Sequence, residues 1–169
     1  MTDEERIIKA QKGDYESFEA VVLKLKDKAY HIAYSYLRDE ADSMDAVCDA
    51  VEKALTNLKQ LKEPKYFSTW FIRIVINECK TQMRKRRSII RLADALYDQG
   101  ARTTANDEAM DLEQTLAALP PLERLLVKMK YVFGYSFEEI AEVTELPTNT
   151  VKSKVYATLR QMRIKMEVR

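Results

Sequence analysis

The sequence contains few residues that interrupt helices. Glycine occurs 3 times and proline 4 times in 169 residues, so long stretches can form helix without a break. No segment approaches the roughly 18 consecutive apolar residues of a membrane span, and the charged N-terminus lacks the apolar run of a signal peptide. We therefore expect an all-α protein that is cytoplasmic and does not insert into a membrane.

The residues that most often build metal sites and catalytic centres are also scarce. Cys48 and Cys79 form no CxxC pair, and His31 is the only histidine, so we predict no metal site and two buried, reduced thiols. The chain has no glycine-rich phosphate loop and no nucleophile with a base beside it. We expect neither catalysis nor a cofactor.

Charge is present in quantity but almost balanced. One third of the residues are charged, yet the net charge is only +1, and 46% of the residues are hydrophobic. Such a composition suits one or two small domains with real cores. Attraction of the whole molecule to nucleic acid would be weak, so any nucleic-acid contact depends on how the charge is distributed.

The segment from Ser136 to Arg163 predicts two short helices joined by a tight turn. Ser136 and Glu139 have the spacing of a capping box at the start of the first helix. Leu146 and Pro147 carry the turn, and Thr148 is suited to cap the second helix. This order of elements is that of a helix-turn-helix, whose second helix fits the DNA major groove.

The second of these helices predicts a DNA-binding face. No acidic residue occurs between Val151 and Lys165, while an apolar stripe occupies the other side. A basic amphipathic helix can also be a merely solvated one, and that alternative stays open for this helix taken alone. The basic residues of this face are Lys152, Lys154, Arg160, Arg163 and Lys165.

A helix predicted from Arg38 to Leu58 has the opposite charge. Acids dominate its first half, with no basic residue between Asp39 and Glu52, and its other side is apolar, formed by Ala46, Val47, Ala50, Val51, Ala54, Leu55 and Leu58. A solvated face is one interpretation. An acidic face would repel DNA, however, so in a DNA-binding protein it is better suited to dock a basic protein partner.

A second basic helix is predicted after the loop from Lys59 to Ser68. It begins near Phe67, and Lys80 to Arg91 contains no acid. Its predicted apolar stripe consists of Phe67, Trp70, Phe71, Ile74, Val75, Cys79 and Met83. Cations on such a face meet phosphates, and Asn and Thr side chains can hydrogen-bond base edges. Its polar face comprises Arg73, Asn77, Lys80, Thr81 and Arg84, followed by Lys85, Arg86 and Arg87.

The remaining segments complete a two-domain plan. Residues 1–87 form one helical domain, 88–107 a flexible linker with weak periodicity, and 108–169 a second helical domain whose first helix Asp107 is suited to cap. The tyrosines of the helix that follows Asp14 fit core packing better than a stacking platform for bases.

Several segments stand in the order found in a known family. They read DSMDAVCDAVEKAL, FSTWFIRIVINECKTQMRKRR and, after the linker, LPPLERLLVKMKYVFGYSFEEIAEVTELPTNTVKSKV. Together they closely resemble the extracytoplasmic-function (ECF) subfamily of bacterial RNA polymerase sigma factors, over nearly the whole chain. The resemblance implies that residues 1–87 bind core polymerase and open the −10 element, and that 108–169 read the −35 element.

The resemblance also implies roles for individual residues. The loop from Lys62 to Ser68 matches the segment that captures a flipped −10 base. An anti-sigma factor is expected as a further partner, because the family commonly has one. The matching positions are Asp45, Asp49 and Glu52 for polymerase binding, Arg73, Asn77, Lys80 and Arg84 for the −10 element, and Thr148, Thr150, Lys152, Ser153 and Lys154 for the −35 element.

The chain departs from the family pattern in the helix-turn-helix. Glu145 and Asn149 stand where the family usually has glycine, so the turn is open to a different construction. Lys154 replaces a usual arginine and loses the bidentate fork that reads guanine, and Ala157 stands where arginine is frequent. Two rival functions remain: a stand-alone helix-turn-helix regulator that dimerises through its N-terminal helices, and a protein-interaction module.

Overall fold

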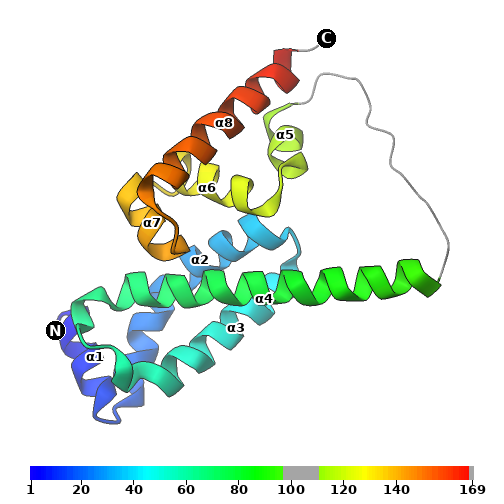
Figure 1. Cartoon of the computed structure of the whole chain (residues 1–169). Helices are drawn as coiled ribbons and strands as arrows, with labels where there is room; N and C mark the ends of the chain where they lie inside the picture. The colour runs from blue at the N-terminus through cyan, green and yellow to red at the C-terminus, as the bar shows by residue number, and fades with distance from the viewer. Residues whose placement is uncertain (97–110, 168–169) are drawn as a thin grey trace.

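The computed structural model describes residues 1–96 and 111–167, with no side-chain description for residue 167. Eight α-helices and two short 3-10 helices, with no strand, make up these ranges, which confirms the predicted all-α class. Within them, no helix is long and apolar enough to cross a membrane. Figure 1 shows the long helix α4 crossing the molecule, with α1 and α3 on one side and α5 to α8 on the other.

The first three helices begin at side-chain caps. α1 (Asp3–Gln11) starts at a Thr2–Glu5 capping box. α2 (Tyr15–Leu37) follows Asp14, whose side chain accepts from the Ser17 N–H, as the sequence predicts. α3 (Glu40–Asn57) is capped by Asp39 through the Asp42 N–H. Each cap satisfies a backbone donor that would otherwise lack an intrahelical partner.

The loop before α4 is built from two single 3-10 turns. These are η1 (Leu58–Gln60) and η2 (Pro64–Tyr66). The side-chain amide of Gln11 donates to the carbonyls of Leu58 and Leu61, at 3.0 and 2.8 Å, and so ties the loop to α1.

α4 (Phe67–Leu96) is longer than the sequence analysis expects. Residues 88–96, assigned there to the linker, continue the helix, since none of them is a glycine or proline. The rest of that predicted linker, residues 97–107, lies outside the described residues.

The C-terminal half contains the predicted helix-turn-helix. α7 (Phe137–Thr144) starts at the Ser136–Glu139 capping box, and α8 (Thr148–Glu167) follows it. Thr148 is the first residue of α8, and the Pro147 carbonyl accepts from the Val151 N–H. The prediction that Thr148 precedes and caps this helix is therefore wrong by one residue.

Two shorter helices precede the helix-turn-helix. α5 (Leu112–Ala118) is capped by Asp111; the predicted cap, Asp107, lies outside the described residues. α6 (Pro121–Tyr131) begins with proline at its first position, where the missing N–H costs nothing.

One hydrophobic core extends through both halves of the molecule. It joins α2 and α4 residues to Leu125, Leu126 and Met129 of α6 and to Ile140 of α7. Helix α6 packs against α2, and α7 packs against α4. The two predicted domains are thus in direct contact.

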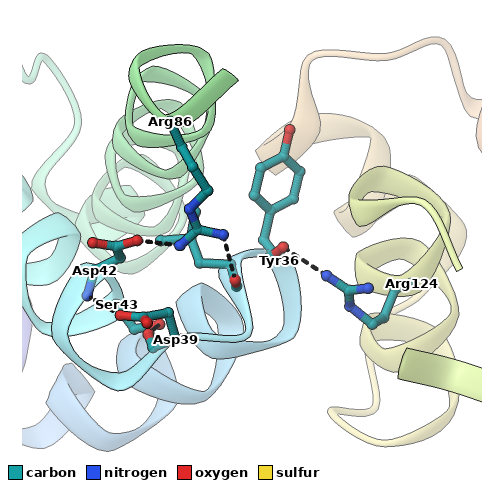
Figure 2. A network of polar contacts seen from close by, with 7 residues as sticks. Tyr36, Asp39, Asp42, Ser43, Arg86 and Arg124 are labelled. Carbon is teal, nitrogen blue, oxygen red and sulfur yellow. Dashed lines mark hydrogen bonds and ion pairs between the residues drawn. The ribbon is translucent and has the colours of Figure 1, made fainter. Parts of the chain in front are cut away.

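Two arginines meet the carboxyl end of α2 from different helices (Figure 2). Arg124 of α6, only 4% exposed, donates to the backbone carbonyls of Ser35 and Tyr36. Arg86 of α4 donates to the carbonyl of Leu37, at 3.1 Å, and to Asp42. The last carbonyls of a helix lack intrahelical partners and carry partial negative charge, so both cations stabilise this end.

Candidate nucleic-acid and protein interfaces

The predicted polymerase-binding acids lie together on the solvent side of α3. Asp45, Asp49 and Glu52 are exposed, and their spacing of four and three residues places them on one helical face. None of them forms an ion pair within the described part of the chain. We call these three residues the acidic stripe. It is available to a basic partner.

An apolar groove borders the acidic stripe. It has a volume of about 730 Å³ and runs between α2 and α3. Leu23 and Met44, each 56% exposed, line it. Apolar side chains gathered in one exposed groove are typical of a surface that a partner covers. The other lining residues are Val22, Lys26, Asp27, Tyr30, Val47, Cys48, Val51, Glu52 and Leu55.

The groove corrects two expectations about α3. Cys48 is exposed in it, so the prediction of two buried thiols is right for Cys79 and wrong for Cys48. Leu55, assigned by the sequence to the packed side of the helix, is 38% exposed and also lines the groove. In both cases helical periodicity identifies the apolar side, but it does not reveal how far the neighbouring helix covers that side.

The predicted −10 residues share one face of α4, but they are not equally accessible. Asn77 and Arg84 are exposed, whereas Arg73 and Lys80 are half-buried. Arg86, which the sequence places in the same basic surface, instead caps α2. The basic run of α4 therefore serves two purposes, and only part of it is free to meet phosphates.

A polar cavity of about 330 Å³ lies beside Asn77, between α3 with its following turn and α4. Trp70 forms part of one wall, and Asn57 and Gln60 contribute amide groups. Buried Glu78 pairs with Lys53 at its edge, and this pairing raises the pKa of Lys53, chiefly through the hydrogen bond to Glu78. The aromatic wall and the amides have the chemistry needed to hold a nucleobase.

The turn of the helix-turn-helix uses the left-handed conformation despite lacking glycine. Glu145 has φ 59° and ψ 33°, and its backbone N–H donates to the Ala141 carbonyl. The turn is thus built with a left-handed residue, and the alternative of a different construction is wrong. A side chain in this conformation costs about 1 to 2 kcal/mol relative to the right-handed one.

The predicted −35 residues lie in the first turns of α8. Ser153 is exposed, and Thr148, Thr150, Lys152 and Lys154 are half-buried. The Lys152 ammonium lies 5.8 Å from the centre of the Phe137 ring. The Lys154 ammonium lies 3.7 Å from a carboxylate oxygen of Glu123 on α6, a partner that the sequence analysis did not include.

The helix-turn-helix is packed along one edge of the predicted −10 face. Arg73 Nε donates to the Glu142 carbonyl at 3.1 Å and lies 3.7 Å from Glu145 Oε1. On α4, Ile72 and Ile76 beside it are each 1% exposed. The arrangement therefore brings a residue predicted for the −10 element into contact with α7 and the turn that follows it.

The described residues contain no group of three or more His, Cys, Asp or Glu side chains that could hold a metal ion. The surfaces described above consist of charged, amide, aromatic and apolar side chains.

Models of two sigma-factor regions match the two halves of the chain. The model of sigma-70 region 2 matches residues 21–89, which include the acidic stripe and most of α4. The model of sigma-70 region 4 matches residues 109–162, which include the helix-turn-helix. With this fold and these interfaces, the chain is a sigma factor of bacterial RNA polymerase.

Curated relatives identify the subfamily. The chain is 29% identical over 144 residues to RNA polymerase sigma factor SigV of Bacillus subtilis, covering 83% of this chain and 86% of the relative. It is 27% identical to the ECF RNA polymerase sigma-E factor of Escherichia coli, covering 92% and 90%. The chain belongs to the ECF subfamily and acts as an alternative sigma factor that directs transcription initiation.

Two solved structures share the fold. CnrH, in complex with the cytosolic domain of CnrY, matches with a TM-score of 0.70 and 20% identity, over 96% of this chain and 95% of CnrH. The sigma factor RpoE from Bartonella quintana, in complex with the anti-sigma factor NepR, matches with a TM-score of 0.71 and 22% identity, over 90% and 98%.

Proposed function

We propose that the acidic stripe and the adjoining groove together form the surface that docks core polymerase. The observation that carries this proposal is the combination of three carboxylates that form no ion pair among the described residues with exposed Leu23 and Met44 beside them. Complementary charge sets the orientation and rate of docking, and the apolar groove supplies buried area that keeps the complex together. A basic, amphipathic helical segment of polymerase fits both features.

Asn77 and the cavity next to it hold an unpaired −10 base in this proposal. Capture of a flipped base requires a pocket and hydrogen bonds to the edge of the base. The side-chain amides of Asn57, Gln60 and Asn77 supply donors and acceptors, and Trp70 supplies an apolar wall. Arg84 and Lys80, further along the same face, meet the phosphates.

The first turns of α8 read the −35 element. Thr148, Thr150 and Ser153 offer hydroxyl groups, while Lys152 and Lys154 offer cations at the end of a helix that fits the major groove. Lys154 is a base reader in this proposal, and Glu123 fixes its position.

The domain division follows from these assignments, with residues 1–87 and 108–169 as the two DNA-reading units. The segment between them, whose residues 88–96 extend α4, is the tether. Tethering makes the second promoter contact intramolecular, so two weak sites act as one strong site. The chain works in the cytoplasm with polymerase and without catalysis. An anti-sigma factor that covers the groove is a further partner, as with the structurally similar RpoE, whose complex contains one.

Transcription in vitro with purified core polymerase tests the proposal. We expect transcripts from a promoter with two unlike elements only when core polymerase and this chain are both present. A stand-alone regulator would instead bind a palindromic site by itself as a dimer. Tight binding to a palindrome without polymerase, together with no transcription, would support that rival.

Asn77→Ala tests the base pocket within the same assay. We expect the variant to bind core polymerase normally and to open the promoter less, measured as permanganate reactivity of unpaired thymines at limiting sigma concentration. Ser88→Ala, an exposed change on the same helix, is the matched control. Normal opening by Asn77→Ala would remove this residue from the −10 interface.

A further inference from the structure

The last turns of α4 project beyond the helices on which it packs (Figure 1) and expose large apolar side chains. Ile89, Ile90, Leu92 and Leu96 are between 50% and 70% exposed. Ile89 and Leu92, three residues apart, are neighbours on the helix surface. Large apolar side chains gathered at one exposed place typically mark a surface that another molecule covers. We call residues 87–96 the projecting end.

The projecting end is also positively charged. Arg87 and Arg91 are exposed, and neither forms an ion pair among the described residues. Asp94 is the only acid from Lys80 to Leu96. DNA phosphates would meet the two arginines but would leave the apolar side chains beside them in water. A protein surface with both acidic and apolar side chains would satisfy both.

The same chain carries such a surface. The groove between α2 and α3 has a volume of about 730 Å³ and exposes Leu23 and Met44. The acidic stripe borders it, and Glu52 belongs to both features. Lys26 and Asp27, also lining the groove, balance each other in charge, so the acidic stripe decides the sign of the charge there. The projecting end and the groove therefore complement each other in charge and in apolar character.

A single chain cannot bring its own projecting end to its own groove. α4 is one unbroken helix from Phe67 to Leu96, and it packs against both α2 and α3. The projecting end therefore leaves the molecule in a fixed direction (Figure 1) and cannot turn back. A second copy meets no such restriction. When each copy supplies its projecting end to the groove of the other, the two contacts together form a two-fold dimer.

We propose that two copies of the free chain pair in this way, with the projecting end of each in the α2–α3 groove of the other. The arginines of the projecting end face the acidic stripe and set the orientation. Ile89 and Leu92 enter the groove and bury Leu23 and Met44. This pairing needs no polymerase and does not depend on the docking role proposed for the groove. If the groove also docks polymerase, the second copy and polymerase compete for it.

Charge exchange between the two surfaces tests the pairing in the full-length chain. The groove variant combines Asp45→Lys with Asp49→Lys, and the end variant combines Arg87→Glu with Arg91→Glu. All four side chains are exposed, so both variants should keep the circular-dichroism spectrum of the parent chain. Sedimentation velocity over a hundredfold range of protein concentration measures the association of each chain and of an equimolar mixture of the two variants.

The matched control is Arg160→Glu combined with Lys165→Glu, which makes the same change in net charge at two exposed positions of α8. We expect the parent chain and this control to show the same monomer–dimer equilibrium, weakened by salt. The groove variant and the end variant, each alone, should lose at least tenfold in association constant, because like charges then face each other. Their mixture should regain the dimer, because lysines on one copy then face glutamates on the other.

Four outcomes separate the pairing from the proposed polymerase docking. A parent chain that stays monomeric over the whole concentration range would overturn the pairing. A mixture that associates no better than either variant alone would overturn it as well. If the mixture regains the dimer while the groove variant still captures core polymerase, the pairing stands and docking at the acidic stripe falls. If the groove variant loses polymerase and the parent chain is monomeric, docking stands and the pairing falls.

Discussion

The two cysteines differ because only one of them is removed from water. Cys79 of α4 is 1% exposed, and burial, with a smaller contribution from Glu78, raises its pKa to about 12 from 9.0. Cys48 is exposed in the groove between α2 and α3. Since the thiolate is the nucleophile, the two residues should react very differently.

We expect iodoacetamide at pH 8 to modify Cys48 and to leave Cys79 unmodified in the folded chain. Peptide mass spectrometry after alkylation measures both sites, and alkylation in urea should modify both. The folded thiol of Cys79 keeps its proton up to about pH 12, while the unfolded thiol loses it near 9. Stability from Cys79 is therefore complete below pH 9 and declines as the pH rises from 9 toward 12. Equal alkylation of Cys48 and Cys79 in the folded chain would contradict the predicted difference in their reactivity.

Modification of Cys48 also tests the groove. Because Cys48 lines the proposed docking surface, alkylation with a bulky maleimide should reduce capture of core polymerase at least tenfold in a pull-down. Cys48→Ser treated with the same reagent is the control and should retain capture. If alkylated chain captures polymerase as well as untreated chain, the groove is not part of the interface.

Lys154 and Glu123 form an ion pair at the proposed −35 interface. Glu123→Gln should free the Lys154 ammonium from its carboxylate partner and strengthen binding to all −35 sequences through the phosphates. Lys154→Ala should instead flatten preference at one base position, by about 1 to 3 kcal/mol. Binding to a set of −35 duplexes with single base changes measures both effects. A base profile that Lys154→Ala leaves unchanged would remove Lys154 as a base reader.

Single basic residues are where sequence reasoning was least informative. The run from Lys80 to Arg91 predicts a basic face, and Arg84 is indeed exposed. Arg86, two residues further on, bonds to the Leu37 carbonyl, 49 residues away in the chain. Arg124 bonds to the Ser35 carbonyl, 89 residues away. The local sequence pattern cannot distinguish an arginine that binds a DNA phosphate from one that binds the carbonyls at a helix end, because both roles use the same N–H donors.

At the scale of elements, the predicted helix boundaries agree with the structure where a capping residue or a helix breaker marks the boundary. Asp14 starts α2, and the Ser136–Glu139 box starts α7, as predicted. The predicted end of α4, in contrast, was wrong. Residues 88–96 lack a helix breaker, and they also lack the apolar periodicity by which a packed helix is identified. Exposed Ile89, Ile90 and Leu92 explain the weak periodicity: this part of the helix has no apolar side to bury against the rest of its own chain.

At the element scale, the proposed docking role of the acidic stripe separates a sigma factor from the rival DNA-binding proteins. Asp45→Lys combined with Asp49→Lys should abolish capture of core polymerase and transcription. Reversed charge opposite a basic partner creates repulsion, and a broken interfacial pair costs about 2 to 5 kcal/mol. Folding should change little, since both side chains are exposed and form no described ion pair. The matched control is Glu19→Lys, an exposed acid on α2 that does not line the groove.

Pull-down and thermal melting together decide this prediction. A folded double variant that binds polymerase fully would remove the docking role. A variant that melts far below the parent chain would show that these acids are structural.

At the scale of the molecule, the contact between the two domains is the feature that the sequence did not predict. A flexible linker was expected between them, and no contact between them was predicted. Ile72 and Ile76 did not belong to the predicted apolar stripe of α4, yet both are buried. Helical periodicity identifies one core-facing side, and a helix that packs between two layers has two.

Arg124 is the residue whose loss should uncouple the domains. Arg124→Met would leave the carbonyls of Ser35, Tyr36 and Leu119 without the donor that now serves them. A buried acceptor without its partner costs about 1 to 3 kcal/mol. Burial lowers the pKa of Arg124 to about 10, but the side chain is still cationic at neutral pH. The Arg124→Met substitution therefore removes both the positive charge and the hydrogen bonds.

Urea unfolding with two probes measures the uncoupling. Trp70 is the only tryptophan and its fluorescence reports on the N-terminal domain, while far-UV circular dichroism reports on both domains. In the parent chain the two transitions should coincide, because one core extends through both domains. In Arg124→Met they should separate, with the helical signal beginning to fall at a lower urea concentration. Arg160→Met, an exposed change on α8, should leave them together. Coincident transitions at an unchanged midpoint in Arg124→Met would mean that this arginine does not couple the domains.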